Sequence, residues 1–236
     1  MLRGAAPAPE ASTYGIAYLT AYESLVLTAN IQQHAGKWIY VAGAAGGVGH
    51  FAAQIAKLYG LKVIGTAGKA ASLQLLRELH LDCVIDYSKQ DVLKEIMRLT
   101  GGKGADVVYD STYTQSSYTQ SAGVLACSGE YIRLGTDMQM KLTGAEDMRR
   151  VVEGRGAKWV IGDLGRYSVD AQYKAQMSKV IDGQKQAVSW SEEGKVRPVI
   201  TETVPSTRRL CSRRLNLHEG INNVGKWSQA LTFDSS

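Results

Sequence analysis

The chain has 236 residues, of which 44% are hydrophobic, 21% charged and 8% aromatic. A chain of this length and composition can bury a sizeable core, which excludes intrinsic disorder and suits one large α/β domain, or one and a half smaller ones. The net charge is +5, from 27 basic and 22 acidic residues. This excess is too small to indicate nucleic-acid binding by itself.

The cysteines and histidines limit the chemistry further. Cys83, Cys127 and Cys211 form no Cys-x-x-Cys pair and cannot make a disulfide framework, so a reducing compartment is the simpler interpretation. They are too few for a structural zinc site, and the four histidines have no histidine partner four residues away. We therefore expect no metal site, and we expect the cysteines to be buried structural thiols.

The sequence carries no segment with the composition of a membrane-spanning helix. Its first twelve residues include one arginine, two prolines and Glu10, and they lack the apolar core of a signal peptide. A cytoplasmic location is expected. A mitochondrial location is the minor alternative, because an acidic residue is unusual in a transit peptide.

Short apolar runs alternate with helical patterns from residue 38 onward. Strands are predicted over residues 38–42, 62–66, 83–86, 105–109, 130–134 and 158–161. Helices are predicted over residues 48–59, 72–79 and 91–99, the last one ended by Gly101 and Gly102. This alternation predicts a doubly wound parallel sheet covered by helices on both faces. Another α/β sandwich, without a nucleotide site, stays an alternative at this point.

A glycine-rich loop at residues 43–49 reads Gly-Ala-Ala-Gly-Gly-Val-Gly and joins the first predicted strand to its helix. A dinucleotide-binding loop needs a glycine at the turn off the strand, a second near the pyrophosphate and a third where helix meets strand. Gly46 and Gly49 fit the second and third positions. Ala44 holds the first position and is small enough for the turn.

Backbone amides near Gly47 and Val48 would then face phosphate oxygens at the start of the helix, with the helix dipole behind them. A purely structural tight turn is the alternative. A nucleoside-triphosphate loop is excluded, because the only Gly-x-x-x-x-Gly-Lys match, at 220–226, is followed by Trp227 and leaves no room for a helix.

The end of the second strand bears on which dinucleotide would bind. NAD sites usually place a carboxylate there for the ribose hydroxyls, but residues 66–69 read Thr-Ala-Gly-Lys. A 2′-phosphate would meet no repulsion, and Lys69 or Arg77 could supply positive charge. This favours NADPH over NADH, although Lys69 could equally be a solvated loop lysine.

Taken in order, several segments resemble the quinone oxidoreductase branch of the medium-chain dehydrogenase/reductase superfamily. They are 19–22 (Leu-Thr-Ala-Tyr), the glycine loop with 51–57, then 63–66, 84–87, 105–111 and 223–226. The similarity runs from residue 16 to residue 204 and resumes briefly near the end. It implies a Rossmann fold, a zinc-independent reaction, and hydride transfer from NADPH to a quinone or a related enone or carbonyl compound. Family members are commonly dimers, paired through the outer edge of the sheet.

The resemblance also implies the cofactor contacts, while it assigns no catalytic residue. The implied contacts are Ala44, Ala45, Gly46, Gly47, Val48, Gly49, Lys69, Ser72, Tyr87, Ser111, Leu134, Gly135 and Asn223. The first six cradle the pyrophosphate, and Tyr87 matches a tyrosine that holds the 2′-phosphate. The family's lysine for that phosphate falls on Ser72, for which Lys69 could substitute. Ser111, Leu134 and Gly135 match positions around the ribose and nicotinamide, and Asn223 matches a late cofactor contact.

The chain departs from the family at both ends. Only 18 residues precede Leu19, where the family carries a catalytic domain of about one hundred residues. The expected organisation is a tail at 1–18, a dinucleotide-binding domain at 19–194, and a segment at 195–236 that returns to a mostly missing, GroES-like β domain. A strand at 197–204 would keep an unpaired edge, so we expect self-association or docking on a partner chain. The arginine-rich stretch 206–218 is either a phosphate-binding patch or a solvent-exposed segment.

Other catalytic patterns are absent from the sequence. It contains no Tyr-x-x-x-Lys pair and no Gly-x-Ser-x-Gly elbow. His50 opens the helix after the glycine loop and reads as a phosphate contact or as a surface histidine. Two functions remain open: an NADPH-dependent reductase that acts on a small quinone or enone, and a non-catalytic NADP(H)-binding subunit.

Overall fold

The computed structural model describes residues 12–135, 145–200, 204–205 and 231–232. Its centre is a six-stranded sheet in the order β3-β2-β1-β4-β5-β6, in which all neighbouring strands run parallel. The strands are β1 Trp38–Ala42, β2 Lys62–Ala67, β3 Cys83–Asp86, β4 Ala105–Asp110, β5 Leu125–Leu134 and β6 Lys158–Gly162. This confirms the predicted doubly wound sheet and its six strands.

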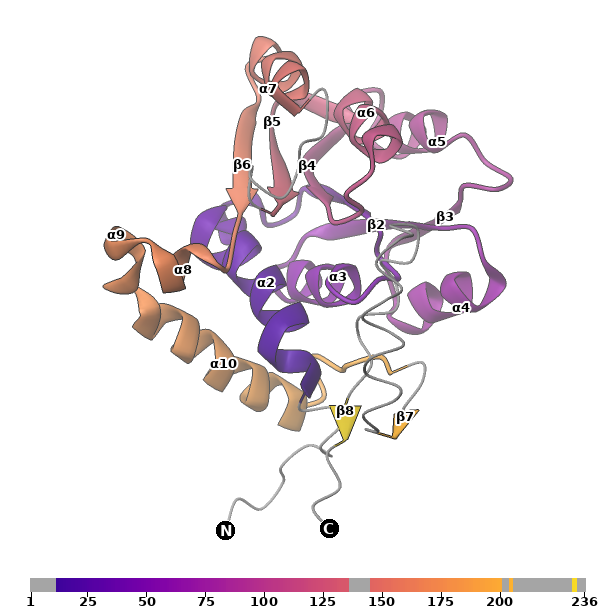
Figure 1. The fold of residues 1–236 in the computed structure, drawn as a ribbon. Coiled ribbons are helices and arrows are strands. Elements are labelled where there is room, and N and C mark those ends of the chain that lie inside the picture. Colours follow the sequence, from indigo (N-terminus) through magenta and orange to yellow (C-terminus); the bar gives the residue numbers. More distant parts are fainter. Residues whose placement is uncertain (1–11, 136–144, 201–203, 206–230, 233–236) are drawn as a thin grey trace.

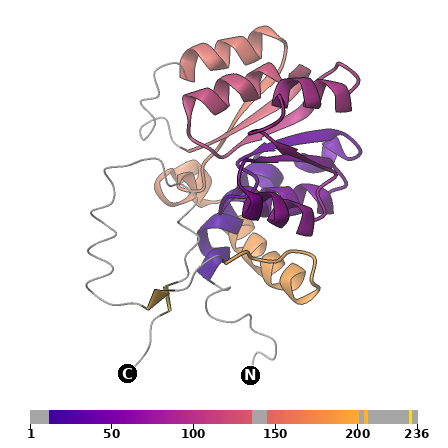
Figure 2. The same cartoon turned by 90° about the vertical axis from the view of Figure 1, so that its right-hand side faces the viewer.

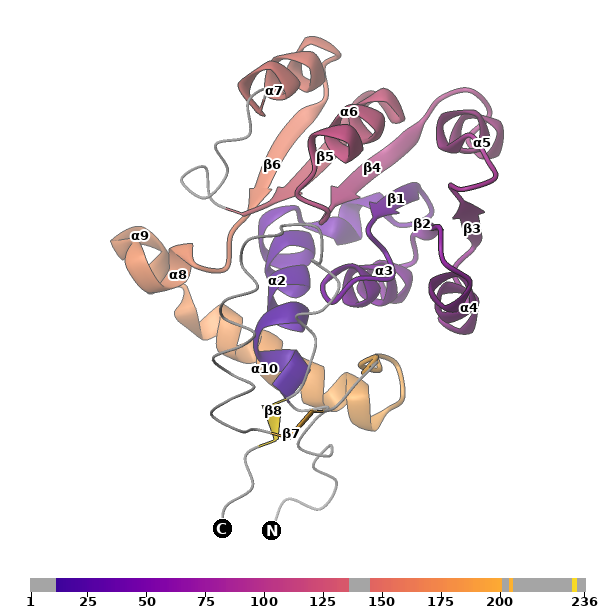
Figure 3. The same cartoon turned by 45° about the vertical axis from the view of Figure 1, so that its right-hand side comes forward.

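Helices cover both faces of the sheet (Figure 1 and Figure 3). One face carries α5 Val92–Leu99, α6 Gln115–Gly123 and α7 Ala145–Gly154, and the other carries α3 Gly49–Leu58 and α4 Ala70–Glu78. The buried side chains accordingly form two clusters, one on each face of the sheet. Strands β1, β2 and β4 are almost wholly buried, because neither face of the sheet meets solvent.

The strand order reverses between β1 and β4. The chain adds β2 and β3 on one side of β1, then returns and adds β4, β5 and β6 on the other side. In doubly wound sheets the loops that leave the carboxyl ends of the strands diverge at such a reversal and open a crevice there. The glycine loop follows β1, so it lies at this point.

A helix over residues 14–28 precedes the sheet and runs across the expected domain boundary between residues 18 and 19. It consists of η1 Tyr14–Tyr18, α2 Leu19–Tyr22 and η2 Glu23–Thr28 in direct succession. Tyr14 and Tyr18 are buried in the core, where their rings contact Phe51 of α3. The boundary between a tail at 1–18 and a domain at 19–194 therefore cuts through a helix, because the aromatic side chains before residue 19 belong to the domain core.

The long helix α10, Met177–Glu192, crosses the helix at 14–28 (Figure 1 and Figure 2). Gly183 of α10 lies against Tyr22, since a Cβ at this glycine would lie 2.6 Å from Cδ1 of the ring. Trp190 further along α10 packs edge-on against the rings of Tyr18 and Tyr22. Two short helices, α8 Arg166–Val169 and α9 Ala171–Lys174, connect β6 to α10.

Two predicted helix ends agree with the structure. Asp91 caps α5, because its carboxylate accepts a hydrogen bond from the Lys94 amide at 3.1 Å. Gly101 and Gly102, with φ of 61° and 79°, end this helix, and the Gly102 amide donates to the Met97 carbonyl at 2.7 Å. By contrast, β5 begins five residues earlier than predicted, at Leu125. A register shift in its pairing with β4, and Ser128 at φ 61°, interrupt the pattern there.

The expected strand at 197–204 is only partly present. Residues 197–200 belong to no helix or strand, residues 201–203 lie outside the described residues, and β7 Val204–Pro205 pairs with β8 Leu231–Thr232. The described end of this segment is therefore paired on one side, and the expected self-association or docking stays a prediction. The arginine-rich stretch 206–218 and Asn223 lie outside the described residues. None of the described helices has the length and apolar character that a membrane crossing requires.

Candidate functional site

The glycine loop makes a tight turn between β1 and α3. Gly43 takes a left-handed φ of 75°, and the Gly46 amide donates to the Gly43 carbonyl at 2.8 Å, which closes the turn. Val48 precedes α3 and cannot cap it, because its side chain is apolar. The His50 amide donates to the Gly46 carbonyl at 3.1 Å, and no described side chain caps the amides before it. A helix start of this kind attracts anions.

Close contacts at three positions of the glycine loop explain why these positions hold small residues. A Cβ at Gly49 would overlap the carbonyl oxygen of Gly43 and lie 3.0 Å from Cα of Ala44, so the helix approaches the strand closely. A Cβ at Gly46 would lie 3.1 Å from the same oxygen. Ala44 is fully buried, and its methyl group faces Gly65 of β2. The glycine on the neighbouring strand leaves the room that lets alanine hold the first position of the loop.

His50, in the first turn of α3, is 1% exposed, which corrects both expectations for this residue. Its Nδ1 lies 2.9 Å from the carbonyl oxygen of Gly46, and its Nε2 accepts a hydrogen bond from the amide of Val199 at 3.3 Å. Burial lowers the pKa of His50 to about 4. The histidine is covered by a segment far along the chain, so it is neither a surface residue nor a phosphate contact.

Tyr87 follows β3 and lies beside the end of β2. Its amide donates to the Ala67 carbonyl at 3.1 Å, and its ring covers Gly68, where a Cβ would lie 2.6 Å from the ring Cζ. The ring is 59% exposed. Tyr87 is thus accessible to solvent next to the loop that leaves β2.

The other residues expected around a 2′-phosphate lie on the same side of the sheet. Lys69 is exposed and immediately precedes α4, and Ser72 is half-buried in the first turn of that helix. Arg77 lies in the last turn of α4, about 12 Å along the helix axis from Lys69 at 1.5 Å per residue. Lys69 is therefore placed beside the β2 loop, whereas Arg77 is at the far end of the helix.

Three expected contacts of the ribose and nicotinamide follow β4 and β5. Ser111 is buried and donates its hydroxyl to the Ala42 carbonyl at 3.0 Å, directly before the glycine loop. Leu134 is fully buried in the core, so only its backbone can face a ligand. Gly135 has φ of 94°, and its amide donates to the Gly162 carbonyl at 3.0 Å.

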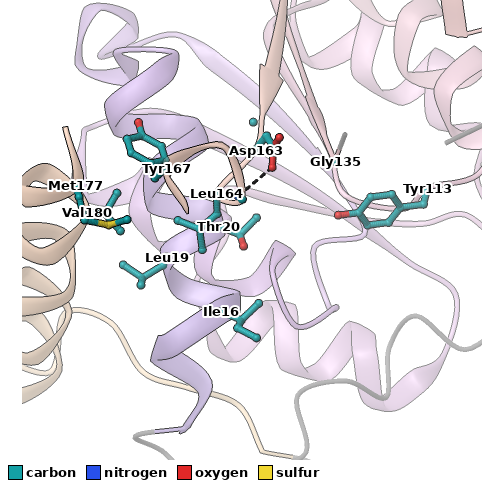
Figure 4. A pocket seen from close by; sticks show the side chains of 12 residues that line it. Ile16, Leu19, Thr20, Tyr113, Gly135, Asp163, Leu164, Tyr167, Met177 and Val180 are labelled. Carbon is teal, nitrogen blue, oxygen red and sulfur yellow. Dashed lines mark hydrogen bonds between the residues drawn. The ribbon is translucent and has the colours of Figure 1, made fainter. Parts of the chain in front are cut away.

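A cleft of about 540 Å³ opens at the carboxyl ends of β5 and β6 (Figure 4). It is lined by Ile16, Leu19, Thr20, Tyr113, Gly135, Gly162, Asp163, Leu164, Gly165, Tyr167, Met177 and Val180. Most of these side chains are apolar, and the polar ones are Thr20, Tyr113, Asp163 and Tyr167. The sequence analysis singled out only Gly135 as a site residue among them, because the rest come from four separate stretches of the chain.

Tyr113 has an unusual backbone conformation, with φ of 59°. Aromatic residues seldom adopt this left-handed region, and such outliers gather at functional sites. Its hydroxyl group points into the cleft (Figure 4). Burial raises the pKa of Tyr113, so the hydroxyl keeps its proton at neutral pH. It is therefore available as a hydrogen-bond donor.

Asp110, at the end of β4, organises the loop that carries Tyr113. Its Oδ1 accepts from the amide and hydroxyl of Thr112 at 3.0 and 2.7 Å. Its Oδ2 accepts from the hydroxyls of Ser117, Ser121 and Tyr131 at 3.0, 2.8 and 3.3 Å. The carboxylate is 1% exposed. An acidic residue closing an apolar strand, followed by several hydroxyl residues, is the sequence signal that could have revealed this network.

The described residues hold no group of three His, Cys, Asp or Glu side chains placed to bind a metal ion. Cys83 is half-buried and Cys127 is exposed, which corrects the expectation that these thiols are buried, and Cys211 lies outside the described residues. Cys127 lies in the first part of β5, where two consecutive residues are exposed.

Comparison with known proteins places this fold and loop in a family. The model of the zinc-binding dehydrogenase family matches residues 47–182. The quinone oxidoreductase of Pongo abelii is 30% identical over 217 residues, which cover 92% of this chain and 61% of the relative. A trans-enoyl reductase of Aspergillus terreus is 29% identical over 185 residues, covering 78% of this chain and 48% of the relative.

Among solved structures, the quinone oxidoreductase of Escherichia coli complexed with NADPH superposes with a TM-score of 0.70. It is 23% identical, and the match covers 90% of this chain and 62% of that one. The chain thus spans about six-tenths or less of the length of these relatives. Because the family model matches more than half of its residues, the chain belongs to the zinc-binding dehydrogenase family.

Proposed function

We propose that this chain is an NADPH-dependent oxidoreductase that passes a hydride to a quinone or to a related enone or carbonyl compound, by a zinc-independent reaction. One observation carries the proposal: uncapped amides at the start of α3 follow a tight glycine turn at the reversal of the strand order. Its relatives are named as quinone oxidoreductases and as a trans-enoyl reductase, which supports this reaction class.

The loop fits the pyrophosphate of a dinucleotide on physical grounds. A side chain at position 46 or 49 would occupy the space beside the Gly43 carbonyl. Because both positions hold glycine, only backbone atoms line this part of the helix start. Amides of Gly47 and Val48 would hold the phosphate oxygens there. The adenosine half would extend toward Gly68 and Tyr87, and the nicotinamide half toward Gly135 and the cleft. The two halves would then lie on opposite sides of the reversal between β1 and β4.

The surroundings of β2 support NADPH as the cofactor. This strand ends at Ala67 and is followed by Gly68 and Lys69, with no carboxylate for a ribose 2′-hydroxyl. A carboxylate does follow at Asp86, on the next strand. Its Oδ1 already accepts hydrogen bonds from the amide and hydroxyl of Ser88, and these bonds lower the pKa of Asp86. Lys69, Ser72 and Tyr87 would then contact the 2′-phosphate.

The cleft supplies what a hydride acceptor requires from the protein. NADPH, when bound, supplies the hydride, so the chain has to hold the acceptor against the nicotinamide and exclude water. Leu19, Leu164 and Val180 give the cleft an apolar lining suited to an enone or quinone ring. The Tyr113 hydroxyl can donate a hydrogen bond to the acceptor's carbonyl oxygen, where negative charge develops during hydride transfer.

The decisive experiment is a titration of the protein with NADPH and with NADH, followed by the same titrations on two loop variants. Gly46→Asp places a carboxylate beside the pyrophosphate and should raise the NADPH dissociation constant at least about tenfold. Gly46→Ala is the matched control, because it adds the same Cβ contact without the charge, and it should lose much less affinity. Equal affinity in Gly46→Asp and the unchanged protein would overturn the loop assignment.

Turnover is measured on the same protein, as NADPH oxidation with 1,4-benzoquinone and with a simple α,β-unsaturated ketone. The proposal predicts oxidation that depends on the acceptor. Binding of NADPH without turnover of either acceptor would instead support the second function, a non-catalytic NADP(H)-binding subunit.

A further inference from the structure

Helix α3 is tied to a segment almost 150 residues further along the chain. The Gln54 side-chain amide pairs with the backbone of Arg197 in both directions: its Oε1 accepts from the Arg197 amide at 2.9 Å, and its Nε2 donates to the Arg197 carbonyl at 3.0 Å. One turn earlier, His50 accepts from the amide of Val199. His50 and Gln54 are four residues apart, so they lie on one face of the helix, and both are buried beneath the segment 197–199.

The hydrogen bonds of His50 fix its tautomer. The Val199 amide donates to Nε2, so Nε2 carries a lone pair and no proton. The proton of the neutral ring is then on Nδ1, which donates to the Gly46 carbonyl at 2.9 Å. The docked segment therefore decides which ring nitrogen faces the glycine loop as a donor.

This contact sets the direction of one peptide group in the loop. The Gly46 carbonyl accepts from Nδ1 of His50 and also from the His50 amide at 3.1 Å, so it points into the helix. The peptide bond is planar and trans, and its carbonyl and N–H point in opposite directions. The Gly47 N–H is therefore turned outward from the helix start, toward the place where a phosphate would bind.

We propose that His50 is a positioning residue: it fixes the Gly46–Gly47 peptide for the pyrophosphate, and the docked segment 197–199 holds His50 in the tautomer that does so. This inference rests on the proposed dinucleotide site at the glycine loop. Because coupling between two sites is reciprocal, NADPH binding at the loop should tighten the docking of the segment, and loosening the segment should weaken NADPH binding.

A pair of variants separates the two hydrogen bonds of His50 in the full chain. His50→Asn places an amide N–H near the position of Nδ1, so it can keep the bond to Gly46 and loses the acceptor for Val199. His50→Gln places its amide oxygen near the position of Nε2, so it can keep the bond to Val199 and loses the bond to Gly46. We expect His50→Gln to raise the NADPH dissociation constant about tenfold, and His50→Asn to recover part of that loss.

A third variant acts on the segment without touching the loop. Gln54→Leu removes both bonds to Arg197 and should speed amide hydrogen exchange at residues 197–199 in the ligand-free protein. It should also raise the NADPH dissociation constant a few-fold, through the coupling. Gln120→Leu, at an exposed glutamine of α6 on the opposite face of the sheet, is the matched control and should change neither. Added NADPH should slow exchange at the Val199 amide in the unchanged protein.

The outcomes separate this inference from the proposed function. If the unchanged protein binds neither NADPH nor NADH, the proposed function fails. If it binds NADPH, and His50→Gln and Gln54→Leu bind it equally well, the positioning role is overturned while the proposed function stands. Should His50→Gln fail to fold, Gln54→Leu decides, because it leaves the loop and its histidine intact. Unchanged exchange at residues 197–199 in Gln54→Leu would also overturn the inference.

Discussion

Gly43 and Gly49 stand at the two ends of the glycine loop, and no side chain fits between them. A Cβ on Gly49 would overlap the carbonyl oxygen of Gly43 and lie 2.7 Å from its carbonyl carbon. The contact is backbone on both sides, so neither partner can move aside by changing a rotamer. This contact holds the start of α3 against the end of β1, which is where the amides of the candidate site gather.

Gly49→Ala should therefore destabilise the fold. Forcing one methyl group into a packed contact costs about 1–3 kcal/mol. Gly123→Ala is a suitable control, because a Cβ at this helical glycine meets nothing within 4 Å, and alanine there should stabilise the helix by up to about 1 kcal/mol. Urea unfolding of both variants checks the prediction. Equal free energies of unfolding for Gly49→Ala and the unchanged protein would contradict the described contact.

The sequence analysis located the sheet well, because each strand of a sheet covered on both faces is a short apolar run. Strands β1 and β3 match the predicted residues, and the others differ mainly by one residue at their ends. The start of β5 escaped prediction because Ser128 and Gly129 interrupt the apolar pattern at the irregular pairing. The helix at 14–28 escaped because its buried tyrosines sit on a segment that the family resemblance left as a tail.

The site was predictable only where local geometry dictates residue type. The small residues of the glycine loop signalled the turn, since a side chain at Gly49 has no space. His50 was misread because its environment comes from Val199, a contact that no local pattern reveals. The cleft was missed for the same reason: Thr20, Tyr113 and Asp163 meet only after the chain has folded.

Asp110 provides a second test of how the site is held together. Asp110→Asn replaces one acceptor oxygen by an amide that has to donate, although every group around the carboxylate already donates to it. The variant should lose about 1–3 kcal/mol of unfolding free energy, because the surrounding hydroxyls lose a charged acceptor and some of them have to rotate to accept from the new amide. Chemical denaturation measures the loss.

The exposed pair formed by Asp182 and Lys185 gives the control for that experiment. Asp182→Asn breaks a solvent-exposed ion pair between residues three apart on α10, and such pairs contribute little. Its free energy of unfolding should stay within about 0.5 kcal/mol of the unchanged protein. A loss in Asp110→Asn no larger than this would mean that the network around Asp110 does not bear on stability.

Tyr113→Phe tests the role proposed for the cleft hydroxyl. The variant keeps the ring and the left-handed backbone, so its stability should match that of the unchanged protein. If the hydroxyl donates to the acceptor's carbonyl oxygen, NADPH oxidation should slow by roughly a hundredfold at saturating acceptor. The NADPH dissociation constant should be unaffected, because the hydroxyl is placed beside the acceptor and not beside the cofactor. A variant with unchanged turnover would remove Tyr113 from the proposed reaction.

The buried histidine makes stability depend on pH in a definite direction. An unfolded histidine titrates near 6.5, whereas burial lowers the pKa of His50 to about 4 in the folded protein. Between these values the unfolded chain takes up a proton that the folded protein refuses. The free energy of unfolding should therefore fall as the pH is lowered through this window. Between pH 7 and pH 5, His50 alone should lower it by about 2 kcal/mol.

Comparison with His50→Gln isolates that contribution from other titrating groups, which both proteins share. The variant has no imidazole ring to protonate. Between pH 7 and pH 5 its free energy of unfolding should therefore fall by about 2 kcal/mol less than that of the unchanged protein. His80 is the control, since it is exposed and His80→Gln should leave the pH dependence as it is. Parallel pH profiles for the unchanged protein and His50→Gln would show that His50 is solvated. In that case the segment 197–199 would not cover it, and the tie between this segment and the glycine loop would be lost.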